Sequence, residues 1–548
     1  MKTFFRLLSL LLAVLMITAL GVIFVSCDDS GSGTGTGLTM EGYDENGLEM
    51  DKLGAGHNYG GEMVYVLAWG EGYQNEREFE VEGISGNSVD DAVVQRNTQI
   101  EGRLNVELDF TFTPGSNPYR NQFTKYVEAA YNSQGKQPID VIATYTRTAG
   151  MLAQRGFLKD IAKLPLTPEQ NWFSFDDTDA DGKLLPNMPW WPSQFMSELS
   201  FGDSTYFVTG DISTSVPYMM TCIFVNKGLF NSLYNADARD LGHEDGMDML
   251  YDLVTSKNWT LAKLIEFSDC YQDQGATGKN VQDRFGFATL LTHVDAFYTG
   301  SELRLVDTDP VEMLVISKDF GSKKAVTLID TLGEFFSADC NYSERWNYEL
   351  DPKLSEGHNV PFTEGRCLFL MGRNYLAESV LAKKVNFSYG ILPVPMYKTA
   401  TYKQNNYYTC MGNPVSLYGI FVNSYFASRS GEEHSNEAEH ISMLTAVLEC
   451  WASEGYRRTT PEIFYVNMMT KYADSPDDAA MFQYVRNGIT FDLGRIFADA
   501  LSTMSELPSH CAMGGSSWSI SYNQYKSKLN SQMEDLVEAF VQQGTNAQ

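Results

Sequence analysis

The part of the chain after residue 61 begins with a regular alternation of two kinds of segment. Short apolar or alternating runs, typical of strands, cover 63–69, 106–112 and 139–143. Stretches with helical apolar spacing cover 90–104, 119–131 and 148–158, the first with Ser88 as its expected N-cap. Because a strand–helix–strand order needs crossover connections, the strands should lie parallel in one sheet. The sequence therefore predicts an α/β fold.

The first 27 residues have the features of an export signal. Lys2 and Arg6 precede an apolar run over 7–25, and the small residue Ser26 follows it. Directly after Cys27 comes a Gly, Ser and Thr-rich stretch that cannot pack into a core. We therefore expect a signal peptide over 1–26 and a flexible linker over 27–61.

The residues Phe24-Val25-Ser26-Cys27 resemble a bacterial lipobox, although Phe24 stands where that pattern usually has Leu. The resemblance implies that Cys27 is lipidated, becomes the new N-terminus and anchors the protein to the outer face of the cytoplasmic membrane. The alternative is an uncleaved transmembrane anchor, because the run 7–25 is just long enough to span a bilayer. In both cases only the anchor contacts the membrane.

Length and charge limit the classes of protein to which the chain can belong. With 548 residues, it predicts two or three domains. Its formal net charge of −30 repels phosphate backbones and anionic lipids, so a nucleic-acid partner is not expected. A neutral solute would be indifferent to this field.

The cysteine pattern does not indicate a zinc site or a disulfide framework. Seven cysteines remain after Cys27, at wide spacings and without a CxxC pair. We expect most of them to be buried as small apolar residues, with one or two disulfides left possible.

Residues 177–182 resemble the start of a calcium loop, with alternating carboxylates closed by Gly182. Met188 stands where such a loop has its bidentate Glu, so an acidic surface loop is the preferred interpretation. No bound metal or cofactor is therefore expected. The chain also lacks the GxSxG, HExxH and P-loop motifs, and we expect a protein that is not an enzyme.

Several segments together resemble the extracellular solute-binding proteins of bacterial ABC importers, in the carbohydrate-binding family that includes maltose-binding protein. The matching segments, in the family's order, are 97–108, 152–160, 206–212, 224–230, 250–260, 362–369 and 389–395. They are spread over nearly the whole exported chain, and no single one is specific.

The resemblance implies the type II periplasmic-binding-protein fold, with two lobes of mostly parallel sheet flanked by helices and a ligand cleft at the hinge. It places the first lobe at 62–212 plus 366–413 and the second at 213–365 plus 414–548. The crossing segments would lie near Gly210-Asp211-Ile212 and Met411-Gly412-Asn413-Pro414.

Candidate ligand contacts come from the carboxyl ends of strands, where the loops of open α/β sheets meet. Sugars suit aromatic rings, which stack on their C–H faces, and planar polar groups, which bond their hydroxyls. The positions selected by strand ends are Trp69, Tyr145, Arg147, Asp211, Arg373, Asn374 and Tyr375. For each of them, packing, a salt bridge or capping of the crossing is the structural alternative.

Three further tryptophans complete the set of candidates. Trp191 lies in the proline-flanked pair 190–191, in which adjacent residues point to opposite sides. Trp346 and Trp518 lie in polar, loop-like stretches. The resemblance implies that Trp518 could supply a stacking platform from the second lobe, as a tryptophan near the C-terminus often does in that family.

The resulting hypothesis is a monomeric, lipid-anchored receptor for a solute, most simply an oligosaccharide. The resemblance implies partners, namely the permease and ATPase subunits of an ABC transporter. Two alternatives remain at this point: an extracellular carbohydrate-active enzyme, and a sensor-associated or adhesive surface module.

Overall fold

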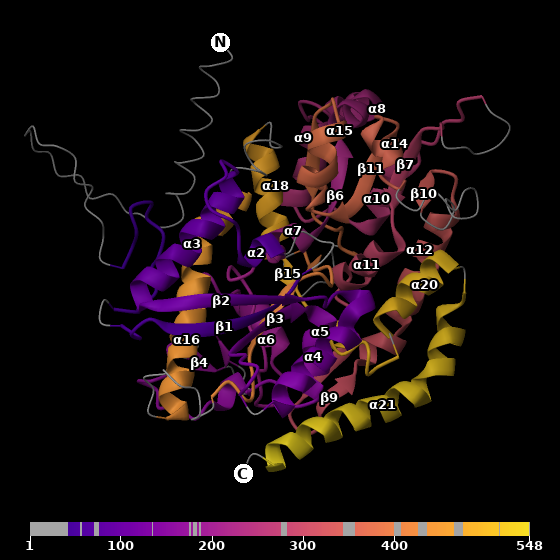
Figure 1. The fold of residues 1–548 in the computed structure, drawn as a ribbon. Coiled ribbons are helices and arrows are strands. Elements are labelled where there is room, and N and C mark those ends of the chain that lie inside the picture. Colours follow the sequence, from indigo (N-terminus) through magenta and orange to yellow (C-terminus); the bar gives the residue numbers. More distant parts are fainter. Residues whose placement is uncertain are drawn as a thin grey trace, which may run out of the picture.

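The computed structural model shows two α/β lobes, each with its own sheet (Figure 1). It describes residues 42–54, 57–70, 76–133, 135–174, 177–178, 184–185, 188–275, 282–343, 357–398, 407–425, 436–464, 475–502, 504–514 and 516–546. None of the helices in these ranges is long and apolar enough to cross a membrane. The apolar run 7–25 and Cys27 lie outside the described residues.

The first lobe contains a four-stranded sheet in the order β14-β3-β1-β2. Its parallel strands are β1 (Glu62–Trp69), β2 (Val106–Thr113) and β3 (Val141–Tyr145), and β14 (Ser416–Ile420) runs antiparallel to β3. The connecting helices are α3 (Ser88–Leu104), α4 (Arg120–Asn132) and α5 (Thr146–Gln154). The predicted strand–helix alternation is confirmed, but Asn87 rather than Ser88 is the N-cap of α3.

The second lobe contains a five-stranded mixed sheet in the order β10-β7-β11-β6-β12. The strands are β6 (Thr221–Asn226), β7 (Phe285–Thr289), β10 (Asn341–Ser343), β11 (Cys367–Arg373) and β12 (Tyr389–Leu392). β6 is antiparallel to both of its neighbours. Helices of this lobe include α8 (Lys227–Asp240), α9 (Gly246–Thr255), α10 (Leu261–Ser268) and α12 (Lys323–Ser337).

The strand pairings differ from the division expected for the second half of the chain. β11 and β12, expected in the first lobe with 366–413, pair with β6 and β7 of the second. β14, expected in the second lobe, pairs with β3 of the first. The physical reason is that β11 and β14 pair with strands far away in the sequence. The apolar pattern of a strand shows that it is buried but not which sheet it joins.

Two neighbouring segments carry the chain between the two sheets. Val208 is bridged to Tyr418 of β14, whereas Met220, just before β6, is bridged to Met411. Residues 209–219 and 412–415 therefore pass between the two sheets and are called here the first and second crossing. Gly210 is needed in the first crossing because a Cβ there would lie 2.3 Å from the Trp190 carbonyl oxygen.

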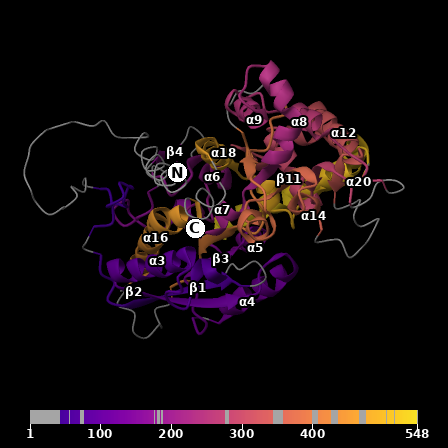
Figure 2. The same cartoon turned by 90° about the horizontal axis from the view of Figure 1, so that it is seen from above.

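Helices after β14 cover both lobes. They are α16 (Glu437–Glu454), α18 (Pro476–Asn487), α19 (Leu493–Ile496), α20 (Leu507–Gly514) and α21 (Trp518–Asn546). α16 packs on α3 and therefore belongs to the first lobe, whereas α18 packs on β12 and belongs to the second. α21 contacts α5 as well as α12, and it runs along one side of both lobes (Figures 1 and 2).

The remaining elements are short. The strand pairs are β4 (Asp177–Thr178) with β5 (Leu184–Leu185), β8 (Val306–Asp309) with β9 (Met313–Ile316), and β13 (Thr409–Cys410) with β15 (Ile489–Thr490). The helices are α2 (Glu76–Phe79), α6 (Ser193–Leu199), α7 (Ser215–Met219), α11 (Asp295–Gly300), α14 (Val360–Thr363) and α15 (Ala382–Lys384). Two π-helical turns, Ala377–Leu381 and Gly455–Thr459, interrupt the regular pattern.

The end of the expected linker is packed on the first lobe. Asp51 and Leu53 are buried, and the Arg103 guanidinium donates to Asp51 Oδ2 over 2.8 Å. The expectation that residues up to 61 form a flexible linker is therefore wrong for this stretch, because Leu53 is buried on the lobe and the charge of Asp51 is paired with Arg103. The prediction that most cysteines are buried is confirmed, since all seven cysteines after Cys27 are buried and free.

Candidate functional site

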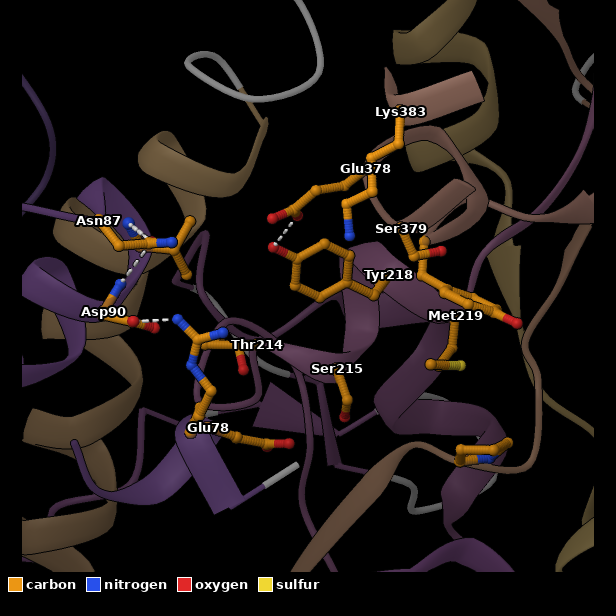
Figure 3. Close-up of a pocket in the computed structure, with 14 residues that line it drawn as sticks. Glu78, Asn87, Asp90, Thr214, Ser215, Tyr218, Met219, Glu378, Ser379 and Lys383 are labelled. Carbon is orange, nitrogen blue, oxygen red and sulfur yellow. Dashed lines mark hydrogen bonds and ion pairs between the residues drawn. The ribbon is translucent and has the colours of Figure 1, made fainter. Parts of the chain in front are cut away.

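A cavity of about 320 Å³ lies between the lobes, beside the two crossings (Figure 3). This volume is in the range of small-molecule sites in proteins. Both lobes and both crossings contribute to its lining: Arg77, Glu78, Asn87, Val89, Asp90, Thr214, Ser215, Tyr218, Met219, Tyr375, Glu378, Ser379, Lys383 and Pro414.

The wall from the first lobe is built at the start of α3. Asn87 accepts hydrogen bonds from the backbone N–H groups of Val89 and Asp90, which caps the helix at the edge of the cavity. Asp90 in turn forms an ion pair with Arg77 of α2. Arg77 remains half-exposed, so its guanidinium keeps N–H groups available to a ligand.

The opposite wall combines α7 of the first crossing with the π-helical turn Ala377–Leu381 of the second lobe. Tyr218 of α7 donates its hydroxyl proton to Glu378 Oε2 over 2.8 Å. Ser379 follows in the same turn, and Lys383 lies on the next one. A single-turn π-helix places side chains where a regular α-helix would not, and such turns are frequent at functional sites.

Tyr375 reaches this wall from the turn after β11. The backbone N–H of Tyr375 bonds the Tyr218 carbonyl over 2.9 Å. Asn374 is buried, and its Nδ2 donates to the Pro217 carbonyl over 2.9 Å. Asn374 thus holds the turn against α7, and this leaves the Tyr375 ring partly exposed beside Tyr218.

The floor of the cavity carries the buried carboxyl of Glu78. Burial raises its pKa, against hydrogen bonds from Ser213, Tyr418 and Ser416 and the nearby charge of Arg96, all of which lower it. Thr214 and Ser215 of the first crossing and Pro414 of the second lie next to it on the cavity surface. The floor is therefore made by the hinge itself.

Four of the charged groups that line the cavity have an ion-pair or hydrogen-bond partner, and Lys383 adds an ammonium group to its surface. Arg77 is paired with Asp90, Glu378 accepts from Tyr218, and Glu78 accepts three hydroxyl donors. The arrangement offers hydroxyl, carboxylate and guanidinium groups together with two tyrosine rings. It suits a neutral ligand rich in hydroxyl groups better than a multiply charged one.

Among the described residues that were predicted to contact a ligand, Tyr375 is the one in the lining of this cavity. Trp69 and Tyr145 lie side by side in the first lobe, with ring centroids 5.6 Å apart. Both are buried, and the Trp69 indole N–H bonds Ser416 Oγ over 2.9 Å. The two residues predicted from the carboxyl ends of strands thus do lie together, but they lie in the core and not at the cavity.

Arg147 and Asp211 are held by internal partners. Arg147 is buried and pairs with Asp499 over 3.0 Å and with Glu506 over 2.9 Å. Asp211 accepts from the Thr460 hydroxyl over 2.7 Å and lies 3.4 Å from an Arg486 nitrogen. Arg147 therefore forms a salt bridge and Asp211 supports the first crossing. These are the structural alternatives to ligand binding that the sequence left open for the two positions.

The predicted tryptophans are enclosed rather than placed at the cavity. Trp191 Nε1 donates to Glu449 Oε2 over 2.8 Å, and Trp518 Nε1 donates to the Phe320 carbonyl over 3.2 Å. Both side chains are buried. Arg373 lies against the second crossing, where a Cβ on Gly412 would be 2.5 Å from its Nε. Trp346 and the side chains of the acidic loop 177–182 lie outside the described residues.

Most of the cavity residues were not predicted from the sequence. The prediction took residues directly after the carboxyl ends of strands, and these lie too close to the sheet. The walls come instead from elements that start several residues later, namely α2 and α3 after β1, and the π-helical turn after β11. One signal was available, because Asn87 followed by two acidic residues marks a helix N-terminus facing the sheet edge. The π-helical turn has no comparable sequence signal.

Comparison with solved structures shows that the chain shares its two-lobe fold with a sugar-binding protein of known structure. The chain resembles the cyclic alpha-maltosyl-1,6-maltose binding protein from Arthrobacter globiformis with a TM-score of 0.50 and 12% identity, over 87% of this chain and 100% of that one. At this identity the likeness establishes the fold, and the predicted two-lobe α/β architecture is confirmed.

Two further solved structures are similar at TM-scores below 0.5. One is a family 1 extracellular solute-binding protein from Bifidobacterium longum subsp. infantis, with a TM-score of 0.47 and 12% identity over 86% of this chain and 99% of that one. The other is the galacto-N-biose-/lacto-N-biose I-binding protein of the ABC transporter from Bifidobacterium longum, with a TM-score of 0.46 and 13% identity over 88% of this chain and 98% of that one. No protein-family model matches the sequence, and no curated protein matches it.

Proposed function

We propose that this protein is the extracellular solute-binding component of an ABC importer and that its ligand is an oligosaccharide. The observation that carries the proposal is the cavity between the lobes, whose charged groups are mostly paired and whose free surface offers hydroxyls and tyrosine rings. The related fold of a protein that binds a cyclic maltosyl-maltose supports it.

The proposed mechanism is a conformational equilibrium without chemical reaction. A ligand that contacts Asp90 from the first lobe and Tyr218 from the second favours the closed state, because only closure brings both sets of groups to it. The permease and ATPase subunits of the importer then recognise the closed form and accept the ligand.

Thermal unfolding of the chain from Asp28 onward tests the proposal. The panel holds malto-oligosaccharides, lacto-N-biose, monosaccharides and alditols, with amino acids and polyamines as charged controls. A ligand at 100 times its Kd stabilises the native state by about 2.7 kcal/mol, which raises the Tm visibly. A shift with amino acids or polyamines and none with sugars would contradict the sugar-binding proposal.

The proposed lipid anchor has a separate test. Wild-type protein and the Cys27→Ala variant are produced in a bacterial host and partitioned between detergent and aqueous phases. Mass spectrometry of the detergent-phase protein is expected to show a wild-type chain that begins at Cys27 and carries acyl mass absent from Cys27→Ala. A wild-type chain that keeps residues 1–26 without added acyl mass would show that the apolar run 7–25 is the anchor instead.

A further inference from the structure

The carboxylate of Glu78 is the acceptor at the centre of a hydrogen-bond network under the cavity. Its Oε1 accepts from Ser213 Oγ over 2.7 Å and from the Tyr418 hydroxyl over 2.8 Å. Its Oε2 accepts from Ser416 Oγ over 3.0 Å. Glu78 is itself only 2% exposed, so these bonds replace its hydration.

The donors come from the first crossing and from the strand that follows the second. Ser213 belongs to the first crossing, whereas Ser416 and Tyr418 begin β14 directly after the second. The two segments are also linked to each other, because the Ser416 N–H donates to Ser215 Oγ over 3.0 Å and the Ser213 and Ser215 hydroxyls lie 2.6 Å apart. Glu78, on α2 of the first lobe, thus joins the first crossing to the start of β14, directly after the second crossing.

The same network reaches the cavity surface. Glu78 and Ser215 line the cavity, and Ser215 is the first residue of α7, which carries Tyr218 at the opposite wall (Figure 3). A displacement of α7 during lobe movement therefore acts directly on the Ser213–Ser215 pair that bonds Glu78. Buried networks in which every member is bonded have well-defined geometry.

Other charged groups near Glu78 are already engaged. Arg96 of α3 is fully buried, donates to the Glu78 carbonyl over 2.9 Å and lies over the Trp451 ring at 5.1 Å. Arg77 and Asp90 pair with each other at the neighbouring wall. The carboxylate of Glu78 therefore accepts hydrogen bonds from Ser213, Ser416 and Tyr418 and forms no ion pair with Arg77 or Arg96.

We propose that Glu78 is the positioning residue of the hinge: by holding the first crossing against the start of β14, directly after the second crossing, it sets the angle at which the two lobes rest when no ligand is bound. The proposal builds on the cavity described under the proposed function, but it concerns the free protein. It therefore stands or falls independently of which solute binds.

The test measures the distance between the lobes in the free full-length chain carrying Cys27→Ser. Cysteines introduced at the exposed positions Lys125 on α4 and Asp240 on α8 carry spin labels, and pulsed EPR gives the distribution of their separation. The seven native cysteines after Cys27 are buried, so the introduced pair is labelled selectively.

Glu78→Gln is the main variant, since its amide keeps the shape but can no longer accept from all three donors. Asp478→Asn is the control, because Asp478 is also a buried carboxylate that accepts from two hydroxyl groups, those of Ser475 and Tyr251, and lies on α18 in the second lobe. Unlike Glu78, Asp478 also pairs with Lys227 over 2.6 Å, so the loss of Tm in this control should be at least as large. Both variants should lower the Tm. Only Glu78→Gln is expected to broaden the distance distribution, by a factor of about two in width, and shift its mean.

An unchanged distribution in Glu78→Gln, with a Tm loss like that of Asp478→Asn, would overturn the proposal and leave Glu78 as a packing residue. If Glu78→Gln does not fold, the double variant Ser213→Ala, Ser416→Ala removes two donors while keeping the carboxylate. Broadening in this variant supports the proposal, and a wild-type distribution contradicts it. Failure of every sugar to stabilise the wild type would count against the proposed function alone.

Discussion

Tyr218 and Glu378 are 160 positions apart in the chain, yet they meet in a hydrogen bond of 2.8 Å on the wall of the interlobe cavity. The bond orients the carboxylate of Glu378 toward the space that a ligand would occupy (Figure 3). It also joins α7, which is the last part of the first crossing, to the π-helical turn after β11.

Removal of the Tyr218 hydroxyl should weaken ligand binding without unfolding the protein. In Tyr218→Phe, Glu378 loses its donor and its orientation, and we expect Kd to rise about 10-fold, which corresponds to the loss of one hydrogen bond. Isothermal titration with the sugar that gives the largest thermal shift measures this. Tyr525→Phe, a partly exposed tyrosine on α21, is the control, and equal Kd values for the two variants would refute the role of Tyr218.

Tyr375 and Trp518 should separate binding from stability. Tyr375→Ala removes a partly exposed ring from the cavity wall, so Kd should rise roughly 10-fold at nearly constant Tm. Trp518→Phe removes an internal hydrogen bond and buried ring area, so it should cost about 1–2 kcal/mol of stability and leave Kd within a factor of about two. If Trp518→Phe raised Kd and Tyr375→Ala did not, Trp518 rather than Tyr375 would be the residue that stacks on the ligand.

Gly455 should tolerate no side chain. A Cβ at this position would lie 2.0 Å from the carbonyl oxygen of Asp211, which is backbone of the first crossing and cannot rotate away. Gly455→Ala should therefore lower the free energy of unfolding by about 1–3 kcal/mol, as judged by chemical denaturation. Gly102→Ala is the matched control, since a Cβ there meets nothing within 4 Å on α3, and it should stabilise by about 0.5–1 kcal/mol.

Glu449 should make stability depend on pH. Burial raises the pKa of its carboxyl to about 7, although hydrogen bonds from Trp191, Ser174 and Trp190 act to lower it. The folded state therefore holds a proton that the unfolded state releases at about pH 4.3, and the stabilisation is complete below that pH and is lost as pH rises to about 7.

Denaturant unfolding of the wild type and Glu449→Gln between pH 4.5 and pH 8 measures this effect. The amide does not titrate, so its constant cost drops out of the comparison across pH. Relative to Glu449→Gln, the wild type should lose about 3 kcal/mol over this range. A difference that stays constant with pH would show that the carboxyl of Glu449 titrates equally in both states.

The strand–helix alternation of the first lobe was predictable because it is encoded locally. Residues 63–69 and 106–112 carry apolar patterns that only a sheet with helices packed on it can bury, and the structure has strands there. The identity of the sheet joined by β11 and β14 was not predictable, since a strand's pattern shows that it is buried but not beside which partner.

The candidate site was predictable only in part. Tyr375 lies at the cavity because it follows the carboxyl end of β11, where the general rule for α/β sheets applies. Trp69 obeys the same rule, but its ring turns inward to Tyr145 and Ser416. Tryptophans were favoured for their chemistry, yet a large apolar ring is equally suited to a core, and sequence alone does not separate the two uses.

The sequence by itself determined the α/β class, the first three parallel strands and the burial of the cysteines, because hydrophobic spacing and composition act within a few residues. Only the tertiary structure decided which strands share a sheet, how Asn374 sets Tyr375 beside Tyr218, and that Glu78 meets Ser213 and Ser416. These contacts join residues up to 338 positions apart. They exist because two lobes and two crossings pack together, and no local pattern encodes that packing.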